Sequence, residues 1–326
     1  MASLREIRRR ISSIRRTQKI TEAMQRVSSA KLHKAQTALG DVLPYEERLN
    51  YMLLTFIHEE RYLYEHGYPQ GMYALRQTPF AIARPINRVS IIFIASDTGL
   101  CGAYNANIEK KLHEVLDQYA GLPRENITLY PVGMQMLEVA RKTGCPVEDR
   151  YVGLMASPDD VTCERISRRL QIGYMRGTVD KAELIYYHFK NMSVQILQRD
   201  TFLPFQSELV KSTNPSFGRE IGGKQGPIIP QEYPLAELDP EYYEGYIVEP
   251  SRQELIDALL PRVLSFQLFR AVLDANASEH AARTIAMKAA SENAQDLVRD
   301  LTLLYNKSRQ QAITAEILDI FSGSVR

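Results

Sequence analysis

Residues 1–40 carry apolar positions that repeat in alternating three- and four-residue steps. The repeat begins within Ser3-Leu4-Arg5-Glu6, where the serine hydroxyl and the glutamate can cap a helix N-terminus reciprocally. Its positions are 4, 7, 11, 14, 18, 21, 25, 28, 32, 35 and 39, which read Leu, Ile, Ile, Ile, Gln, Thr, Gln, Ser, Leu, Ala and Leu. This spacing predicts a long helix with a coiled-coil seam that is polar in its centre. A second amphipathic stretch reaches about His58, with Gly40 and Pro44 as candidate breaks.

The other end of the chain carries a matching pattern. Pro250 precedes Ser251-Arg252-Gln253-Glu254, a second capping box at the start of a long helix. The three- and four-residue steps then pass through positions 259, 263, 266, 270, 273, 277, 280, 284, 287, 291, 294, 298, 301, 305, 308, 312 and 315. Pro261 predicts a kink near the start, and Gly323 is the predicted end. A helix of about 70 residues predicts a rod of roughly 105 Å.

Such a helix needs a packing partner, because most helical stability comes from burying an apolar face. A globular segment between the two ends favours antiparallel pairing of the first and last helices over a dimeric coiled coil, which stays the alternative. Small seam residues allow close approach but bury little; they are Ala277, Ser291, Ala294, Ser308 and Ala312. We therefore expect the helix pair to need an outer sleeve.

The middle of the chain alternates between strand and helix patterns. Strands are predicted at 89–95, 127–132, 183–189 and 194–202, with a short one near Tyr151, and helices at 105–119, 134–142 and 158–175. This alternation predicts a Rossmann-like α/β domain with a mostly parallel sheet.

Residues 207–240 are rich in Pro and Gly and lack periodicity, which is typical of a long surface excursion. The predicted organisation is an N-terminal shaft helix (1–58), a central α/β domain (59–250) with a Pro/Gly-rich insertion at about 207–245, and a C-terminal shaft helix (251–326).

Charge is unevenly distributed along the chain. The net charge is +1, but residues 1–40 hold ten Lys/Arg against Glu6 and Glu22, a balance of +8. A positive rod indicates an acidic partner surface, which could be nucleic acid, anionic lipid or an acidic protein loop. The densest apolar run, Val89 to Ala95, is far shorter than the roughly 20 residues of a membrane span, so no direct membrane insertion is expected.

The residues do not assemble a recognisable active site. The loop Ser96-Asp97-Thr98-Gly99-Leu100-Cys101-Gly102 lies between a strand and a helix but lacks the lysine of a phosphate loop, so Gly99 and Gly102 are interpreted as serving a tight turn with close helix approach. Cys101 is interpreted as a buried packing residue. His280 falls on the seam, where an interhelical hydrogen bond is expected, and Asp159 with Asp160 reads as acid at a helix N-terminus. No histidine spacing suggests a metal, and no cofactor is expected.

Two other classes of protein stay open at this point. One is a nucleotide-using α/β enzyme with a helical dimerisation stalk. The other is a basic coiled-coil protein that binds nucleic acid, although no RRM, zinc or helix-turn-helix signature is present.

Several segments together resemble the gamma subunit of F-type ATP synthase. They are residues 18–31 (QKITEAMQRVSSAK), the loop 96–102 with Thr98 where Arg is usual, residues 277–283 with 286–288, residues 305–310, and the ending 313–316 with Asp319, Gly323 and Ser324, the last standing where Ala is usual. The matches cover nearly the whole chain in order. The chain exceeds the usual family length around residues 60–86 and 207–245.

The resemblance implies a non-catalytic rotor without nucleic-acid partners. The coiled coil would turn inside a ring of alpha and beta subunits, and the α/β domain would stand on the membrane c-ring with the epsilon subunit. Proton flow would thereby be coupled to ATP synthesis or hydrolysis, at the cytoplasmic face of a bacterial inner membrane. By the same matching, the residues that touch the surrounding ring are Met24, Arg283, Arg309, Gln310, Thr314 and Glu316.

Overall fold

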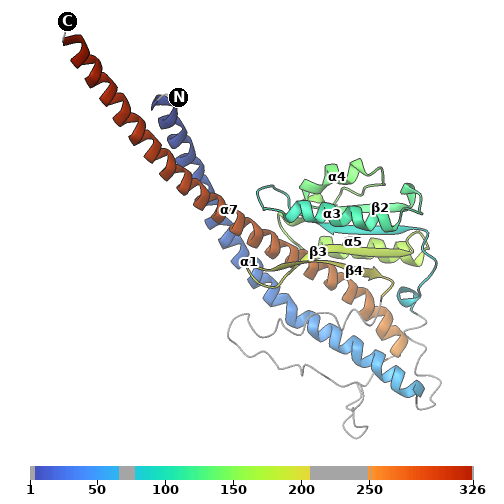
Figure 1. The fold of residues 1–326 in the computed structure, drawn as a ribbon. Helices are drawn as coiled ribbons and strands as arrows, with labels where there is room; N and C mark the ends of the chain where they lie inside the picture. Colours follow the sequence, from blue (N-terminus) through green and yellow to red (C-terminus); the bar gives the residue numbers. More distant parts are fainter. Residues whose placement is uncertain (1–3, 66–77, 206–248, 250, 325–326) are drawn as a thin grey trace. The chain divides into compact units, whose positions relative to one another are not determined.

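The computed structural model describes residues 4–65, 78–205, 249 and 251–324 (Figure 1). The main elements in chain order are α1 (Leu4–Glu65), β1 (Val89–Ile94), α3 (Tyr104–Gln118), β2 (Ile127–Val132), α4 (Leu137–Lys142), α5 (Asp160–Met175), β3 (Lys181–Phe189), β4 (Gln195–Leu203) and α7 (Arg252–Ser324). Short 3-10 turns lie at Pro79–Ala81, Arg124–Asn126, Met134–Met136 and Val152–Met155. Long helices at the two ends and a mixed sheet between them confirm the predicted fold class.

The chain divides into two compact units, and each long helix contributes to both. Unit 1 contains Met1–Leu32, Leu100–Gly102 and His280–Arg326. Unit 2 contains His33–Gly99 and Ala103–Glu279. Unit 1 is therefore formed almost entirely by parts of the two long helices, whereas unit 2 also contains the whole sheet.

Unit 2 is built on a four-stranded sheet with the order β2-β1-β3-β4. β1 pairs in parallel with β2 and β3, and β3 pairs antiparallel with β4. Every residue of β1 is buried, which is expected where both faces of a parallel sheet are covered. The sheet is therefore mostly parallel, as the alternating pattern predicted, and the β3–β4 hairpin confirms the predicted strand pair.

The core of unit 2 joins the sheet to the two long helices. Leu49 and Leu53 of α1 and Leu260, Leu264 and Leu268 of α7 belong to the same buried cluster as the strand residues. The α/β fold and the helix pair of this unit therefore share one hydrophobic core, so neither can bury its apolar face without the other.

Two local predictions were wrong or incomplete. The helix α1 continues through Gly40 and Pro44 and ends at Glu65, beyond His58. Leu39, Leu49 and Leu53 on either side are buried, so tertiary packing overrides the cost of one proline in the helix.

The short strand expected near Tyr151 does not form. The chain makes a 3-10 turn at Val152–Met155, after a single parallel bridge between Leu129 and Val147. Val152 and Met155 are both buried, and the three-residue period of the turn places them on one side, which a strand would not.

The helix α7 runs through Pro261 without ending, and the expected kink there stays a prediction. The excursion at 207–240 lies outside the described residues.

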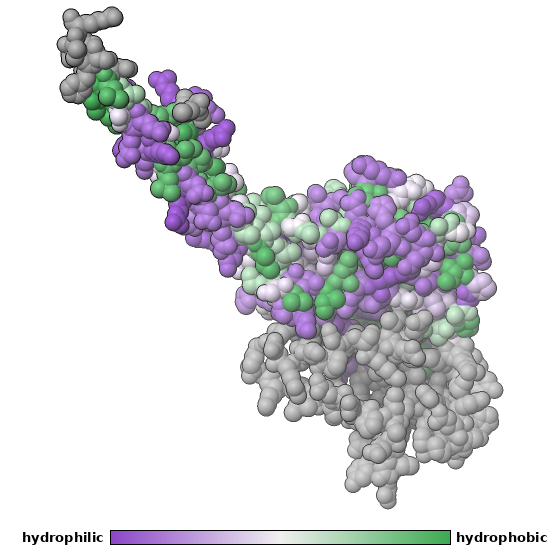
Figure 2. Space-filling view, in the orientation of Figure 1, coloured by the Kyte–Doolittle hydropathy of each residue, from purple (hydrophilic) through white to green (hydrophobic). Residues whose placement is uncertain are grey.

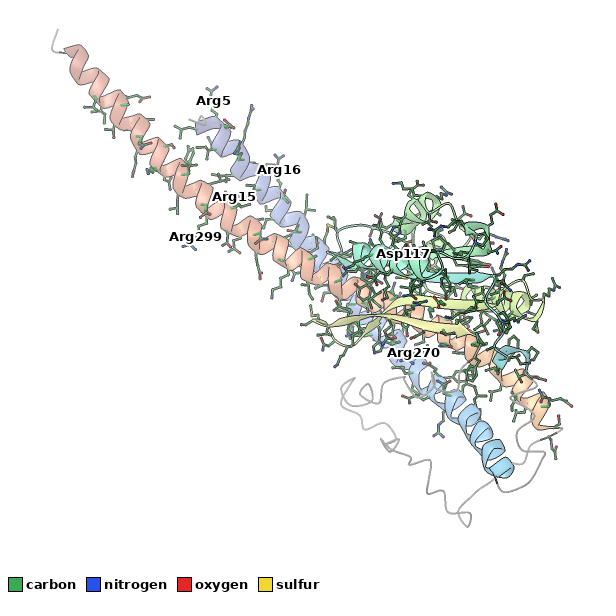
Figure 3. All side chains as sticks on the ribbon, turned by 45° about the vertical axis from the view of Figure 1, so that its right-hand side comes forward. Arg5, Arg15, Arg16, Asp117, Arg270 and Arg299 are labelled. Atoms are coloured by element: carbon green, nitrogen blue, oxygen red, sulfur yellow. The ribbon has the colours of Figure 1, made fainter. Side chains whose placement is uncertain are left out.

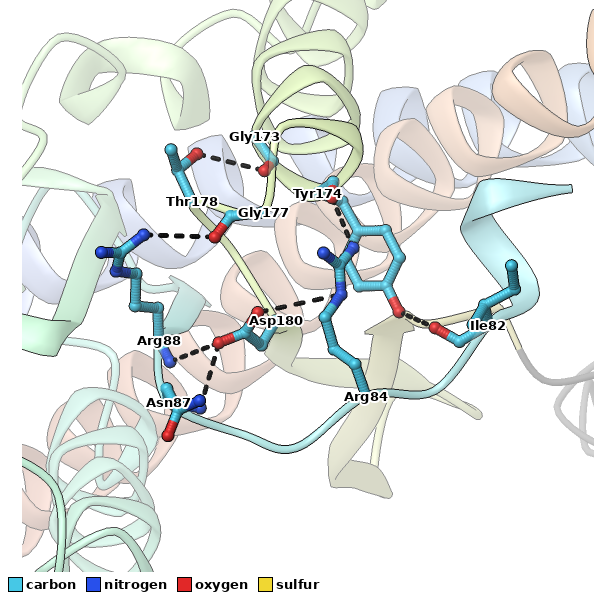
Figure 4. A network of polar contacts seen from close by, with 9 residues as sticks. All are labelled: Ile82, Arg84, Asn87, Arg88, Gly173, Tyr174, Gly177, Thr178 and Asp180. Atoms are coloured by element: carbon cyan, nitrogen blue, oxygen red, sulfur yellow. Dashed lines mark hydrogen bonds and ion pairs between the residues drawn. The ribbon is translucent and has the colours of Figure 1, made fainter.

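A network of polar contacts holds residues 82–88 against the end of α5 and the segment that follows it (Figure 4). The guanidinium of Arg84 lies 4.1 Å from the centroid of the Tyr174 ring and donates to the Tyr174 carbonyl at the end of α5. The Tyr174 hydroxyl donates to the Ile82 carbonyl. The Asp180 carboxylate accepts the backbone N–H of Arg88 at 2.9 Å, just before β1. A cation at the last carbonyls of a helix is favourable, so this contact also caps α5.

We predict that Gly133→Ala destabilises the chain more than Gly144→Ala. Both glycines have positive φ, 109° and 75° respectively, and such a conformation costs about 1–3 kcal/mol for another residue. A Cβ on Gly133 would also lie 2.1 Å from the Ala95 carbonyl oxygen, whereas one on Gly144 meets nothing within 4 Å. Urea denaturation of both variants measures the difference, and equal losses would contradict the packing argument.

Candidate functional site

The candidate functional site is the helix pair of unit 1. On α1 the seam positions are the protected ones: Ile7, Thr21, Ser28 and Leu32 are buried, and Leu4, Ile11, Ile14, Gln18 and Gln25 are half-buried. On α7 the protected seam positions are His280, Thr284, Met287, Ser291 and Ala294, all buried. Burial at the predicted positions confirms the seam. We call this seam thin, because the polar and small residues in its centre bury little apolar surface.

Protection by the seam ends well before α7 does. Ala294 is the last buried residue of α7 among those whose side chains the structure describes, which end at Leu318. Val298, Leu301, Tyr305, Ser308 and Ala312 continue the seam spacing but are only half-buried, and Ala315 is exposed. The end of this helix therefore has no complete packing partner within unit 1.

Unit 1 also exposes large apolar side chains outside the seam (Figure 2). They are Ile20, Val27, Leu100, Ile285, Leu297, Leu303, Leu304, Ile313, Ile317 and Leu318. Leu303 is 63% exposed and Leu318 is 62% exposed. Exposed apolar surface on this scale marks an interaction site, which agrees with the sleeve expected from the small seam residues. The exposed apolar residues of the two helices could have been found in the sequence, because they are apolar residues at positions outside the seam.

The basic residues near the start of α1 are exposed. Figure 3 shows Arg5, Arg15 and Arg16 along this part of the helix. Arg10 pairs with Glu6 at 3.2 Å across one turn, an exposed contact worth little to stability. The positive charge predicted for the rod therefore faces outward, where a partner can use it.

His280 sits in a positively charged part of the seam. Its Nδ1 lies 3.5 Å from Nη1 of Arg283, one turn further along α7, so the contact is within the helix and not the interhelical bond we expected. Burial, then the charges of Arg283 and of Lys31 on α1, lower the pKa of His280 to about 4. The imidazole is therefore neutral at pH 7, and Nδ1 accepts from the guanidinium.

All residues predicted to touch a surrounding ring lie in unit 1. Met24 is half-buried beside the seam, and Arg283 is buried with 7% exposure. The others are exposed on the end of α7: Arg309, Gln310, Thr314 and Glu316. The Thr314 hydroxyl donates to the Gln310 carbonyl one turn back, at 2.9 Å.

The loop 96–102 has the geometry of a structural turn. Leu100 and Gly102 have φ of 64° and 63°, and Cys101 is buried, as predicted. A Cβ on Gly102 would lie 3.7 Å from that of Ala286, so the close approach predicted for this glycine is present. Gly99 does not have a positive φ, and a Cβ added there would meet nothing within 4 Å, so the close approach predicted for Gly99 is not found at its Cβ position.

Two further features bear on the chemistry of the chain. Asp159 caps α5 by accepting the Thr162 N–H at 2.7 Å, which confirms its structural interpretation. Within the part of the chain that the structure describes, no group of three His, Cys, Asp or Glu side chains could hold a metal. No described helix is long and apolar enough to cross a bilayer.

Comparison with known proteins identifies the family. The family model described as ATP synthase matches residues 3–325. The ATP synthase gamma chain of Bacteroides thetaiotaomicron is 41% identical over 327 residues, covering 100% of both chains. That of Phocaeicola vulgatus is 41% identical over 325 residues, also covering 100% of both. The chain belongs to the ATP synthase gamma-chain family. The resemblance read from the sequence is confirmed, and with it the role of a central-stalk rotor subunit of ATP synthase.

A solved structure shares the fold of this chain. It is a chain from the central stalk and c-ring of Tetrahymena thermophila mitochondrial ATP synthase, with a TM-score of 0.51 at 20% identity, covering 83% of this chain and 99% of that one. The Bacteroides thetaiotaomicron relative aligns over its whole length, so the segments around 60–86 and 207–245 that exceed the usual family length have counterparts there.

We predict that His280 makes the protein less stable as the pH falls from about 6.5 to 4. In this window the unfolded chain binds a proton at His280 that the folded chain does not, because the folded pKa is lowered from 6.5 to about 4. The wild type should therefore lose stability relative to His280→Gln. Urea denaturation at pH 7 and pH 4.5 measures this, and a difference between the two proteins that does not change with pH would contradict it.

Proposed function

We propose that the helix pair of unit 1 turns inside a ring of alpha and beta subunits and carries rotation to their catalytic sites. In this proposal, residues 1–58 and 251–326 act as the shaft, and residues 59–250 act as the head that attaches to the epsilon subunit and the membrane c-ring. Proton flow through the c-ring is thereby coupled to ATP synthesis or hydrolysis. The complex lies at the cytoplasmic face of a bacterial inner membrane.

The observation that carries this proposal is the combination of a thin seam with exposed apolar side chains. Beyond Ala294 the seam residues with described side chains are half-buried or exposed, while Leu303, Leu304 and Ile313 are exposed outside the seam. A protein sleeve around the helix would bury both sets, which is the arrangement a shaft in a ring requires. A nucleic-acid duplex would satisfy the arginines of α1 but would leave these apolar side chains in water.

We propose that the chain itself performs no catalysis. Ser96, the hydroxyl residue at the start of the loop 96–102, is fully buried and donates to the Thr98 carbonyl at 2.7 Å. Its backbone N–H donates to Asn105 Oδ1 at 3.1 Å. Both donors are used inside the fold, so they do not face a phosphate. Isothermal titration of the full chain with ATP should give no binding heat, and saturable binding would support the enzyme alternative.

The residues predicted to contact the ring remain part of this proposal. Met24 lies beside the seam on the basic helix, and we propose that an acidic loop of the beta subunit passes it there. The exposed residues Arg309, Gln310, Thr314 and Glu316 would face the inner wall of the ring, and Arg283 would act from its buried position beside His280.

Met24→Lys should weaken the coupling between ATP hydrolysis and proton pumping while the complex still assembles. The half-buried position tolerates a long side chain, since a lysine stem can lie along the helix with its charge in water. Pumping per ATP hydrolysed, measured in inverted membrane vesicles, gives the result. Met24→Leu conserves volume and is the matched control, which should stay coupled. Coupling that is the same in Met24→Lys and the control would remove Met24 from the proposed contacts.

Leu303→Glu should leave the isolated chain as stable as the wild type and weaken its association with the catalytic ring. Leu303 is 63% exposed, and exposed substitutions usually change stability by within about 0.5 kcal/mol. Burial of a carboxylate in an apolar sleeve would be costly. Asn306→Glu places the same charge at an exposed polar position and serves as control. Co-purification of the ring with tagged variants measures the effect, and equal recovery with both variants would count against an apolar sleeve at Leu303.

A further inference from the structure

Part of α7 within unit 2 is buried on every side. Every residue from Ala271 to Glu279 is buried, including the polar residues Asp274, Asn276 and Ser278. Successive residues of an α-helix point about 100° apart, so this stretch covers all directions around the helix more than once. A seam with one partner helix would protect only one stripe, so the fold itself encloses this part of α7.

Directional hydrogen bonds reach this stretch from several elements. The Tyr104 hydroxyl of α3 donates to the Ala275 carbonyl at 3.0 Å. Nδ2 of Asn276 donates to the Met155 carbonyl at 2.9 Å. The Ser278 hydroxyl donates to the Tyr187 carbonyl of β3 at 3.3 Å. These three contacts leave α7 in different directions, so they depend on the rotation of the helix about its own axis.

A buried charged cluster adds contacts on a further side. Nη1 of Arg270 lies 3.1 Å from Oε1 of Glu46 on α1, and Nε of Arg270 lies 3.8 Å from Oδ2 of Asp274. Nδ1 of His188 on β3 lies 2.9 Å from the same Asp274 oxygen. Arg270 is labelled in Figure 3, on α7 next to β3 and β4. The cluster therefore joins α1, α7 and the sheet within unit 2.

Burying these charged groups costs free energy of desolvation, so the cluster stabilises the core less than its short distances suggest. Burial raises the pKa of Glu46 although the guanidinium of Arg270 lies beside it, so desolvation outweighs the attraction. Among the described residues, Glu46 Oε2, Arg270 Nε and Asp274 Oδ1 make no hydrogen bond. Apolar residues of similar volume often give equal or greater stability at such sites. The best-attested use of a buried polar group that costs stability is to fix one register of a helix against its neighbours.

We propose that Glu46, His188, Arg270 and Asp274 form a register lock that fixes the rotation and axial position of α7 within unit 2. These are positioning residues for the rotor, and this role rests on the proposed function of the helix pair. The small residues Ala271, Ala275 and Ala277 belong to the enclosed stretch, and their short side chains offer little resistance to sliding or turning of the helix. The ion pairs and hydrogen bonds resist sliding and turning of α7, which the packing of small side chains alone would not prevent.

Fixed register matters for a rotor because α7 is one continuous helix from Arg252 to Ser324. A slip by one residue turns each side chain by about 100°, and a slip by one turn moves it by about 5 Å. The first slip would let the head turn without turning the rest of α7 by the same amount, and the second would move the rest of α7 along its axis relative to the head. The lock therefore acts where torque enters the helix.

The first test measures register directly in the full chain, whatever its function. Nitroxide labels at Arg262→Cys on α7 and Arg168→Cys on α5 occupy exposed positions of unit 2, and the native cysteines are buried. The test variant combines Glu46→Leu, His188→Leu, Arg270→Met and Asp274→Leu. Pulsed electron paramagnetic resonance should give a narrow distance distribution in the otherwise wild-type chain. In the test variant it should broaden or shift by about 5 Å, one helical turn, while the melting temperature is kept or raised.

The second test measures coupling in the assembled complex and uses single substitutions, in case the combined variant does not fold. His188→Leu removes the contact to Asp274, whereas His188→Asn keeps an N–H close to the place of Nδ1. Proton pumping per ATP hydrolysed should fall in His188→Leu and be restored in His188→Asn. Tyr119→Phe removes a 2.7 Å hydrogen bond to the buried Glu183, away from α7, and should stay coupled.

The outcomes separate the lock from the proposed function. Unchanged label distances in a folded test variant, or, if it does not fold, equal coupling in His188→Leu and His188→Asn, would overturn the lock. Altered distances with coupling intact would confirm the register and overturn its part in torque transfer. Failure of the tagged chain to recover any catalytic ring would overturn the proposed function and leave the distance result standing.

Discussion

The structure depends on the burial of one helix, α7, whose surroundings change along its length. In unit 2 every side of residues 271–279 is covered by the fold. From His280 to Ala294 only the seam positions and their immediate neighbours are protected, and after Ala294 none of the described side chains is buried. Because helical stability comes mainly from packed faces, the end of α7 is the part that most needs a partner from outside the chain.

The thin seam and the enclosed stretch serve opposite requirements. A shaft inside a ring must present its own surface to the partner, so it cannot cover its exposed side with its own chain. The head must hold the same helix without slip, which favours directional contacts such as the Asp274–His188 pair over apolar contacts alone. Apolar side chains such as Leu303 are exposed on the shaft part of α7, and charged side chains such as Asp274 are buried in the enclosed stretch. This reverses the usual distribution of residue types, and both departures fall on the functional parts of the helix.

The sequence predicted the elements well where the periodicity was long or the apolar run was dense. The alternating steps of α1 and α7 located seam residues such as Ile7 and Met287, because a helix repeats its faces at fixed spacing. The errors came where tertiary packing decides. Pro44 does not end α1, since Leu39 and Leu49 on either side are buried. The apolar residues after Tyr151 form a 3-10 turn, since a short apolar segment does not by itself distinguish a strand from a turn that points into the core.

The features of the candidate site also fall into those that the sequence determined and those that the tertiary structure decided. By itself, the sequence determined the helix pair, the positive first helix, the α/β middle and the family, because these depend on spacing, composition and matching segments that need no partner. Only the tertiary structure decided that Arg270 and Asp274, which the sequence pattern places on or beside a seam, meet Glu46 and His188. These residues are far apart in the chain, and their meeting depends on how α1, α7 and β3 pack. The same holds for His280, whose contact with Arg283 and lowered pKa follow from burial and from Lys31 on the other helix, which no pattern within α7 contains.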